Sequence, residues 1–255
     1  DDLWCQLFSE PSAGSDLAGL RTRSERDGDD WIINGQKIWT SNAQRADLAI
    51  LVTRSDPDAE KHKGLTYFYL DMKSPGIEVR PIKQISGLAN FNEVFLTDVR
   101  IPDSQRLGKE GEGWKVAITT LMNERVVAGE RPPPDFEDIF ALSQQLEIET
   151  GPAIRNSAIR EKLANWYIQT QGVRLTRMRS ITALSRGLEP GPENSIGKAV
   201  SAYKRQEISA FGMDLMDMAG ALTDPDMAPM RALFQDALME SPSSRIAAGT
   251  DEILR

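Results

Sequence analysis

The spacing of hydrophobic and polar positions changes near residue 110 of the chain. Before it, short runs of β-branched and aromatic residues are separated by Gly, Pro, Asn and Asp, which is typical of strands and turns. After Gly113, apolar residues recur every three to four positions, which indicates helices. The pattern therefore predicts a domain of strands over residues 1–110 and a helical domain over residues 111–255.

The strand half is expected to form a β-barrel or sandwich, because no helical pattern lies between its apolar runs. In Trp31–Trp39, the Asn34–Gly35 pair is expected to make the tight turn of a hairpin, since both residues tolerate positive φ. Asp47–Thr53 is almost continuously apolar, as in a strand that is buried on both faces. Further strands are expected at Leu65–Leu70, Ile77–Ile82 and Phe91–Val99.

The second half is expected to contain long helices that pack as a bundle. Breaks at Arg131–Pro134 and Gly187–Pro192 separate them, because proline does not continue a helix. The Pro/Ser-rich residues 241–244 are expected to form a turn after the last helix. The helices are expected at 112–129, Ile154–Met178, Asn194–Ala221 and Ala228–Glu240.

Composition and charge exclude several classes of protein. Of the 255 residues, 40% are hydrophobic, which is enough for a folded core. Acidic residues outnumber basic ones by 38 to 30, and this balance argues against a nucleic-acid partner or an anionic membrane surface. One cysteine and one histidine exclude a disulfide framework and a Cys/His zinc site within the chain, and we expect no metal. No apolar run is long enough for a membrane span, and we expect a cytoplasmic protein.

Two segments of the strand half are candidates for contact with a flat ligand. Small residues in Phe8–Asp16 would let backbone N–H groups approach a ligand closely. Trp39 precedes Thr40 and Ser41, which places an indole beside two hydroxyls at the end of a strand. Taken alone, the first segment also fits an ordinary loop and the second a half-buried hairpin tryptophan.

Two charged residues interrupt the apolar face of the helix expected at 112–129. On a helical wheel, Arg125 falls in the middle of the apolar arc that contains Trp114, and Glu124 falls at its edge. Charges on such a face are costly unless they are paired or line a cavity. The residues are therefore either a structural ion pair or a carboxylate in a partly dry site, where a raised pKa would suit a general base.

The end of the chain is typical of the start of a helix. Gly249 and Thr250 are followed by two acidic residues, Asp251 and Glu252. The free N–H groups at such a start attract an anion or a carbonyl oxygen.

These segments, in this order, resemble the motifs of the acyl-CoA dehydrogenases. Phe8–Asp16 resembles Y/F-T/S-E-P-x-A-G-S-D, and Asn34–Asn42 is similar to N-G-x-K-x-W-I/T-T/S-N. Asn92–Pro102 resembles the strand that ends the family's middle domain, and Gly249–Arg255 resembles G-T-S/D-E-I-x-R. The resemblance spans essentially the whole chain.

The resemblance implies an α+β fold in which a middle β-barrel domain, residues 1–110, precedes a C-terminal four-helix bundle, residues 111–255. The family's N-terminal helical domain is not matched by any segment. The chain has no initiator Met. We therefore expect a fragment, or a chain whose start is missing.

The family removes hydrogens from Cα and Cβ of an acyl-CoA thioester and makes the trans-2-enoyl-CoA with FAD as cofactor. An electron-transfer flavoprotein is the implied electron acceptor. Carried over by motif position, the substrate contacts are Ser15, Arg125 and Gly249. The FAD contacts are Gln6, Phe8, Ser9, Gly14, Ser15, Trp39, Thr40, Ser41, Thr250 and Glu252.

The chain departs from most of the family at the base that takes the α-proton. Most members carry this base as a Glu immediately before Gly-Thr, where this chain has Ala248. A minority, the isovaleryl-CoA dehydrogenase type, place it in a Glu-Arg pair on the first helix of the C-terminal domain. Glu124 and Arg125 match that pair, so the resemblance implies that Glu124 is the catalytic base.

A second departure concerns the segments that hold the adenosine half of FAD across a subunit interface in the family's homomers. The family patterns R-x-x-F-G and Q-x-x-G-G-x-G are not matched at Arg131–Phe136 or Asp217–Ala221. A homologous partner chain could supply these contacts, as in the α2β2 acyl-CoA dehydrogenases of actinobacterial steroid side-chain degradation. The opening of this chain, Trp4–Phe8 followed by Ser-Glu-Pro, resembles that type.

We therefore expect an α2β2 heterotetramer with a homologous chain. Its substrate is the CoA ester either of a steroid side chain or of a short branched chain, and the sequence leaves this choice open. Two alternatives stay open. One is a partner subunit without its own base, which only completes a neighbour's site. The other is a flavin monooxygenase or nitroalkane oxidase on the same fold.

Overall fold

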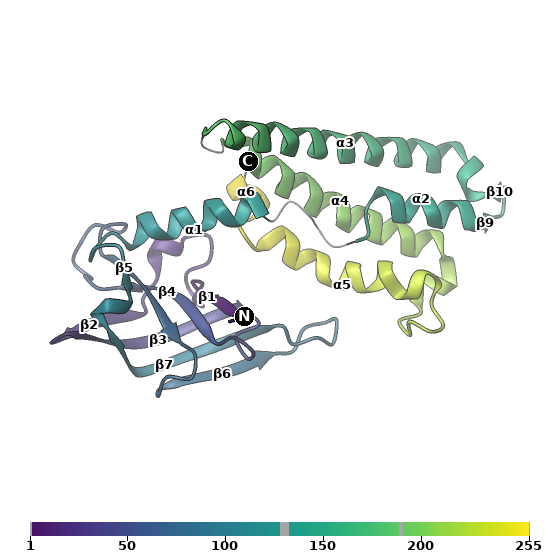
Figure 1. Ribbon diagram of the computed structural model, residues 1–255. Helices are drawn as coiled ribbons and strands as arrows, with labels where there is room; N and C mark the ends of the chain where they lie inside the picture. The colour runs from purple at the N-terminus through teal and green to yellow at the C-terminus, as the bar shows by residue number, and fades with distance from the viewer. Residues whose placement is uncertain (1, 128–132, 189–190, 255) are drawn as a thin grey trace. The chain divides into compact units, whose positions relative to one another are not determined.

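The computed structural model describes residues 2–127, 133–188 and 191–254, and the side chains of residues 125–127 and 194 lie outside the described part. The chain divides into two compact units, Asp1–Leu121 and Met122–Arg255. The first consists mainly of strands and the second of helices (Figure 1), which confirms the predicted mixed α/β chain with its strands first. In the described part, no helix is long and apolar enough to cross a membrane.

One sheet of eight strands forms the first unit, in the order β6–β7–β3–β2–β4–β5–β8, and β1 pairs with β4. Most neighbours are antiparallel, whereas β4 pairs in parallel with both β1 and β2. The outer strands β6 and β8 are not paired with each other among the described residues, so the predicted closed barrel is not confirmed. The strands are β1 (Trp4–Leu7), β2 (Arg23–Asp27), β3 (Asp30–Ser41), β4 (Leu48–Arg54), β5 (Leu65–Asp71), β6 (Ile77–Ile82), β7 (Phe91–Pro102) and β8 (Arg106–Leu107).

Alternating side chains of these strands build the core of the first unit. Trp31 of β3 lies edge-on to Phe68 of β5, with ring centroids 5.4 Å apart, inside a cluster of buried aliphatic residues. A second cluster holds the segment after β1 against the start of α1 (Gly113–Val127), where Phe8 and Ala117 are both buried. The loop and the first turns of α1 are therefore fixed by apolar packing.

The hairpin expected at Asn34–Gly35 is wrong, because β3 continues through both residues. The turn lies earlier, at Gly28, which has φ +65° and joins β2 to β3. Gly35 has a different role: a Cβ atom there would lie 2.5 Å from Oγ1 of Thr22 and 2.7 Å from its Cα. Glycine is needed at this position for close backbone approach rather than for a turn.

The second unit is helical, and α4 (Glu193–Leu215) packs against α2, α3 and α5. Its core contains Trp166 and Phe211, with ring centroids 5.3 Å apart, and the fully buried Phe234. The other elements are α2 (Phe136–Gln145), β9 (Glu147–Ile148), β10 (Gly151–Pro152), α3 (Ser157–Ser185), α5 (Leu233–Ile246) and α6 (Asp251–Leu254), with short 3-10 turns at Ala153–Arg155, Asp217–Ala221 and Pro229–Ala232.

The turn predicted at residues 241–244 is also wrong, because α5 continues through them with Pro242 inside the helix. Proline has no N–H to donate to the carbonyl of Leu238, four residues earlier. The hydroxyl of Ser241 donates to that carbonyl instead, over 2.9 Å. The side chain of Ser241 thus compensates for the proline. Helix α2 and the short β9–β10 pair were not predicted.

Candidate functional site

Trp39 lies in a bulge near the end of β3. The pairing of β3 with β7 shifts between Lys37 and Thr40, so Ile38 and Trp39 lie opposite a single residue of β7. The φ angle of Trp39 is +60°, in the left-handed region that bulky residues seldom adopt. Its indole is 57% exposed, and its edge packs against Phe91. The bulge therefore presents a flat aromatic surface outward, and such strained positions cluster at functional sites.

The loop that carries Ser9 meets β3 at this bulge. The backbone N–H of Ile38 donates to the carbonyl of Ser9 over 2.9 Å. Glu10 and Ala13 exchange two backbone hydrogen bonds of 3.0 Å, which closes the next turn of the loop. The two segments singled out in the strand half therefore adjoin, with Ser9 bonded to the residue that precedes Trp39.

Three hydroxyls lie around the bulge, and they differ in exposure. Oγ1 of Thr40 is buried and has no hydrogen-bond partner among the described residues. Ser9 is half-buried and Ser41 is exposed. We name Ser9, Trp39, Thr40 and Ser41 the β3-end cluster. A buried hydroxyl without a partner is costly, so a donor or acceptor supplied by a ligand would stabilise it.

The remaining residues predicted in this half differ in exposure. Gly14 and Ser15 are exposed on the loop, and Gln6 is half-buried on β1. The ring of Phe8 is buried and lies edge-on to Tyr67, with centroids 5.8 Å apart. Its side chain therefore belongs to the core, and its backbone carbonyl accepts from Nζ of Lys37 at 3.0 Å.

A buried ion pair, missed from the sequence, lies beneath the β3-end cluster. Nζ of Lys37, which is 0% exposed, lies 2.9 Å from Oε1 of Glu10. Complete burial lowers the pKa of Lys37 to about 8, although Glu10 raises it. Burial disfavours the charged form of Glu10, but attraction to Lys37 and hydrogen bonds hold its pKa below the ordinary value. The sequence does contain a signal for this pair, because Lys37 lies on the same buried face of β3 as Trp31 and Ile33.

In the second unit, the segment Gly249–Asp251 is held by basic side chains. Nζ of Lys198 donates to the carbonyls of Gly249 and Arg245. The guanidinium of Arg245 donates to Asp251 from Nε, over 2.7 Å, and from Nη2. Oγ1 of Thr250 accepts from the N–H of Ile253 over 3.3 Å, so the predicted helix start at α6 is confirmed.

The other residues predicted in this unit differ in exposure and backbone conformation. Ala248 precedes Gly249 with φ +54°, and Glu252 is exposed. Glu124 is half-buried near the end of α1. The side chain of Arg125 lies outside the described residues.

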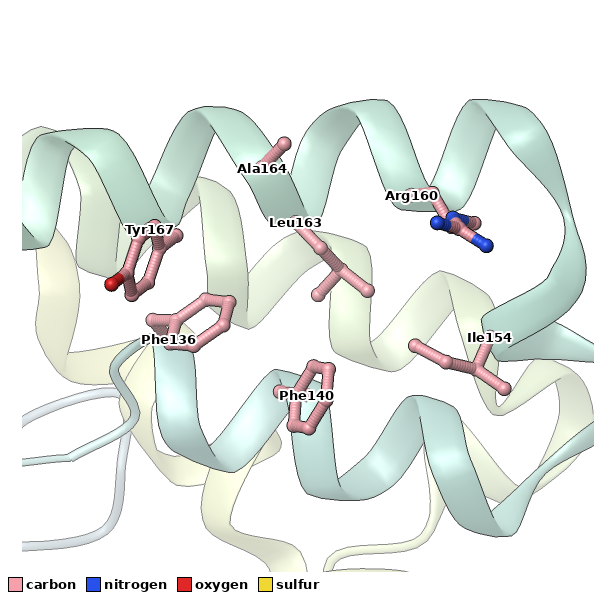
Figure 2. Close-up of a pocket in the computed structure, with 7 residues that line it drawn as sticks. All are labelled: Phe136, Phe140, Ile154, Arg160, Leu163, Ala164 and Tyr167. Atoms are coloured by element: carbon pink, nitrogen blue, oxygen red, sulfur yellow. The ribbon is translucent and has the colours of Figure 1, made fainter.

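A separate groove of about 370 Å³ lies between α2 and α3 and contains none of the predicted site residues (Figure 2). Phe136 and Tyr167 face each other in it, with ring centroids 5.2 Å apart. Arg160 supplies its charged end. No group of three or more His, Cys, Asp or Glu side chains in the described part of the chain could hold a metal ion.

Comparison with known families accounts for both halves of the chain. Residues 5–99 match the family model of the acyl-CoA dehydrogenase middle domain, and residues 111–255 match that of the acyl-CoA dehydrogenase C-terminal domain.

Individual relatives are similar over nearly all of this chain. The acyl-CoA dehydrogenase FadE34 of Mycobacterium tuberculosis is 38% identical over 99% of it, and the chain spans only 34% of the length of that protein. The solved structure of the Tcur3481-Tcur3483 steroid ACAD has a TM-score of 0.87 at 27% identity, with 100% of this chain and 66% of that one covered. The ChsE4-ChsE5 complex from Mycobacterium tuberculosis has a TM-score of 0.84 at 26% identity, with 100% and 67% covered.

Proposed function

Because the chain belongs to the acyl-CoA dehydrogenase family, we propose that it is part of an enzyme that removes hydrogens from Cα and Cβ of an acyl-CoA thioester. The observation that carries this proposal is the β3-end cluster, where an exposed indole in a strained bulge adjoins a buried hydroxyl without a partner. These residues stand at the positions where the family's motifs contact the flavin.

The β3-end cluster fits the flavin end of FAD. The indole of Trp39 offers a flat surface for the ring system, and the hydroxyls of Ser9, Thr40 and Ser41 offer hydrogen bonds. When bound, FAD supplies the acceptor for the hydride that leaves Cβ. We assign further FAD contacts to Gln6, the backbone of Phe8, Gly14, Ser15, Thr250 and Glu252.

We assign the α-proton to Glu124. The α-proton of a thioester is weakly acidic, so a positioned carboxylate must take it. Ala248 stands where most of the family has that carboxylate, and its methyl group cannot accept a proton. Ser15, Arg125 and Gly249 are the proposed substrate contacts.

Replacement of Glu124 by Gln tests this assignment. Glu124→Gln should bind FAD as the wild type does but lose turnover by roughly 10² to 10⁴, the contribution of a positioned general base. Glu161→Gln, an exposed change on α3, is the matched control and should keep full turnover. Ala248→Glu in the Glu124→Gln background should restore part of it if both positions face the same Cα–H. Turnover of Glu124→Gln within a few-fold of the wild type would remove Glu124 from the mechanism.

A second candidate is a partner subunit without its own base, which Ala248 favours. In an assembly with a homologous chain, this candidate predicts that Glu124→Gln leaves turnover unchanged. Turnover would then be abolished by loss of the homologous chain's own base.

The finer features of the assembly are also proposals. We propose domain limits at residues 1–110 and 111–255, the family's barrel for the first and a four-helix bundle of α2–α5 for the second. We propose an α2β2 heterotetramer that passes electrons to an electron-transfer flavoprotein. The similarity to the solved Tcur3481-Tcur3483 steroid ACAD and to the ChsE4-ChsE5 complex supports a steroid side-chain thioester and an unlike partner.

A further inference from the structure

The buried pair Lys37–Glu10 joins the separate segments that carry the β3-end cluster. The three donors of the Lys37 ammonium each have an acceptor: the carbonyl of Phe8 at 3.0 Å, Oε1 of Glu10 at 2.9 Å and the carbonyl of Val52 at 2.8 Å. These acceptors lie on the loop after β1 and on β4, whereas Lys37 itself belongs to β3. One side chain therefore ties three segments together.

Glu10 extends the same connection toward β2. Its Oε2 accepts from the N–H of Arg21 at 2.6 Å, and its Oε1 accepts from the N–H of Thr22 at 2.9 Å. The carboxylate is almost wholly buried, so its oxygens are desolvated and depend on these donors. Hydrogen bonds from Lys37 to Phe8 and Glu10, and from Arg21 and Thr22 to Glu10, thus determine the conformation of the loop around Ser9.

The position of the pair next to the bulge distinguishes it from an ion pair that only stabilises the core. Lys37 is the last residue of β3 before the bulge, and Trp39 is two positions further on. The carbonyl of Phe8, which Lys37 binds, belongs to the residue before Ser9. The backbone hydrogen bond from Ile38 to Ser9 therefore joins the residues that directly follow Lys37 and Phe8.

We propose that Lys37 and Glu10 are positioning residues that hold Ser9 and Trp39 in one fixed arrangement toward the flavin. This inference rests on the proposed flavin function. A buried charge pair gives little net stability, because its attraction is offset by the loss of water around both charges. The pair adds directional hydrogen bonds to segments that also meet through apolar packing and through the backbone bond from Ile38 to Ser9.

The test replaces both charges together, since removing one would leave the other buried and unpaired. Lys37→Met combined with Glu10→Gln keeps the side-chain volumes and one of the two acceptor oxygens that Arg21 and Thr22 use. The matched control is Arg106→Met with Asp103→Asn, which removes a 2.8 Å ion pair elsewhere in the same unit. Circular dichroism and the melting temperature check that each double variant is folded.

The first readout does not involve FAD. The N–H of Ile38 should exchange with solvent roughly ten-fold faster or more in the Lys37/Glu10 double variant, while that of Ile33 stays protected. The second readout uses added FAD, in whichever assembly of the full-length protein retains it. Its Kd should rise about ten-fold or more, and its visible absorption band should shift, because the indole and hydroxyls no longer hold one geometry.

The outcomes separate the inference from the proposed function. Unchanged exchange at Ile38 overturns the positioning role, and so does faster exchange with an unchanged Kd and band for FAD. The same changes in the Arg106/Asp103 control would show a general loss of stability and overturn it as well. A wild-type protein that binds no FAD in any assembly overturns the proposed function, and with it the flavin part of this inference.

Discussion

Cys5 is the single cysteine of the chain and is buried on β1, next to the half-buried Gln6. Burial raises the pKa of its thiol to about 12. At pH 8 on the order of one thiol in ten thousand is then ionised, and only the thiolate reacts. A raised pKa also means that this group supports folding below its ordinary pKa and loses that contribution as the pH rises toward 12.

We therefore expect Cys5 to resist alkylation by iodoacetamide at pH 8 in the native protein and to react fully in urea. Mass spectrometry of samples taken over time measures the rate, and Cys5→Ala provides the unlabelled control. Labelling of the native protein as fast as that of the unfolded chain would mean that β1 is not buried as described.

At the scale of the element, the start of α3 depends on one side chain. Oδ1 of Asn156 accepts from the N–H of Ala158 at 3.0 Å and from that of Ile159 at 3.3 Å. These donors have no partner within the helix, so the amide oxygen stabilises the first turn.

Asn156→Ala should lower the free energy of unfolding by about 1 kcal/mol, the usual cost of losing such a cap. Asn156→Asp keeps the acceptor and should retain wild-type stability. Urea unfolding followed by far-UV circular dichroism measures both. Equal stability of the Ala and Asp variants would show that water replaces the cap.

For the whole molecule, the prediction concerns the far end of FAD. The β3-end cluster is proposed to bind the flavin, whereas the family's patterns for the diphosphate and adenosine half are not matched at Arg131–Phe136 or Asp217–Ala221. Charge-assisted hydrogen bonds contribute about 1.5–3 kcal/mol each, so two missing contacts would weaken binding by roughly two to four decades.

We therefore expect the full-length protein, expressed alone, to lose FAD during purification. Expressed with a homologous partner, it should carry about one FAD per pair of unlike chains. Flavin absorbance against protein mass, with the assembly sized by light scattering, gives the ratio. A stable homotetramer with one tightly bound FAD per subunit would disprove the need for a partner and leave the dehydrogenase proposal intact.

The sequence by itself determined the features that depend on local chemistry. Alternating and continuous apolar runs located β4 to β7, because a strand buried on one face alternates apolar and polar residues and one buried on both faces is apolar throughout. Thr250 before two acidic residues predicted the start of α6, since a cap is made within one turn. The motif order identified the family, because its motifs are short and contiguous.

Only the tertiary structure decided the features that depend on partners distant in the chain. β3 continues through Asn34–Gly35 because β7 pairs with it on both sides of a register shift and Thr22 approaches Gly35 closely. The bulge at Trp39 arises from its register against β7, and Lys37 finds its partners on other segments. Local preferences allowed a hairpin at Asn34–Gly35 and a surface lysine at Lys37. Hydrogen bonds and burial supplied by distant strands outweighed those preferences, because a buried polar group without a partner costs more than a turn propensity provides.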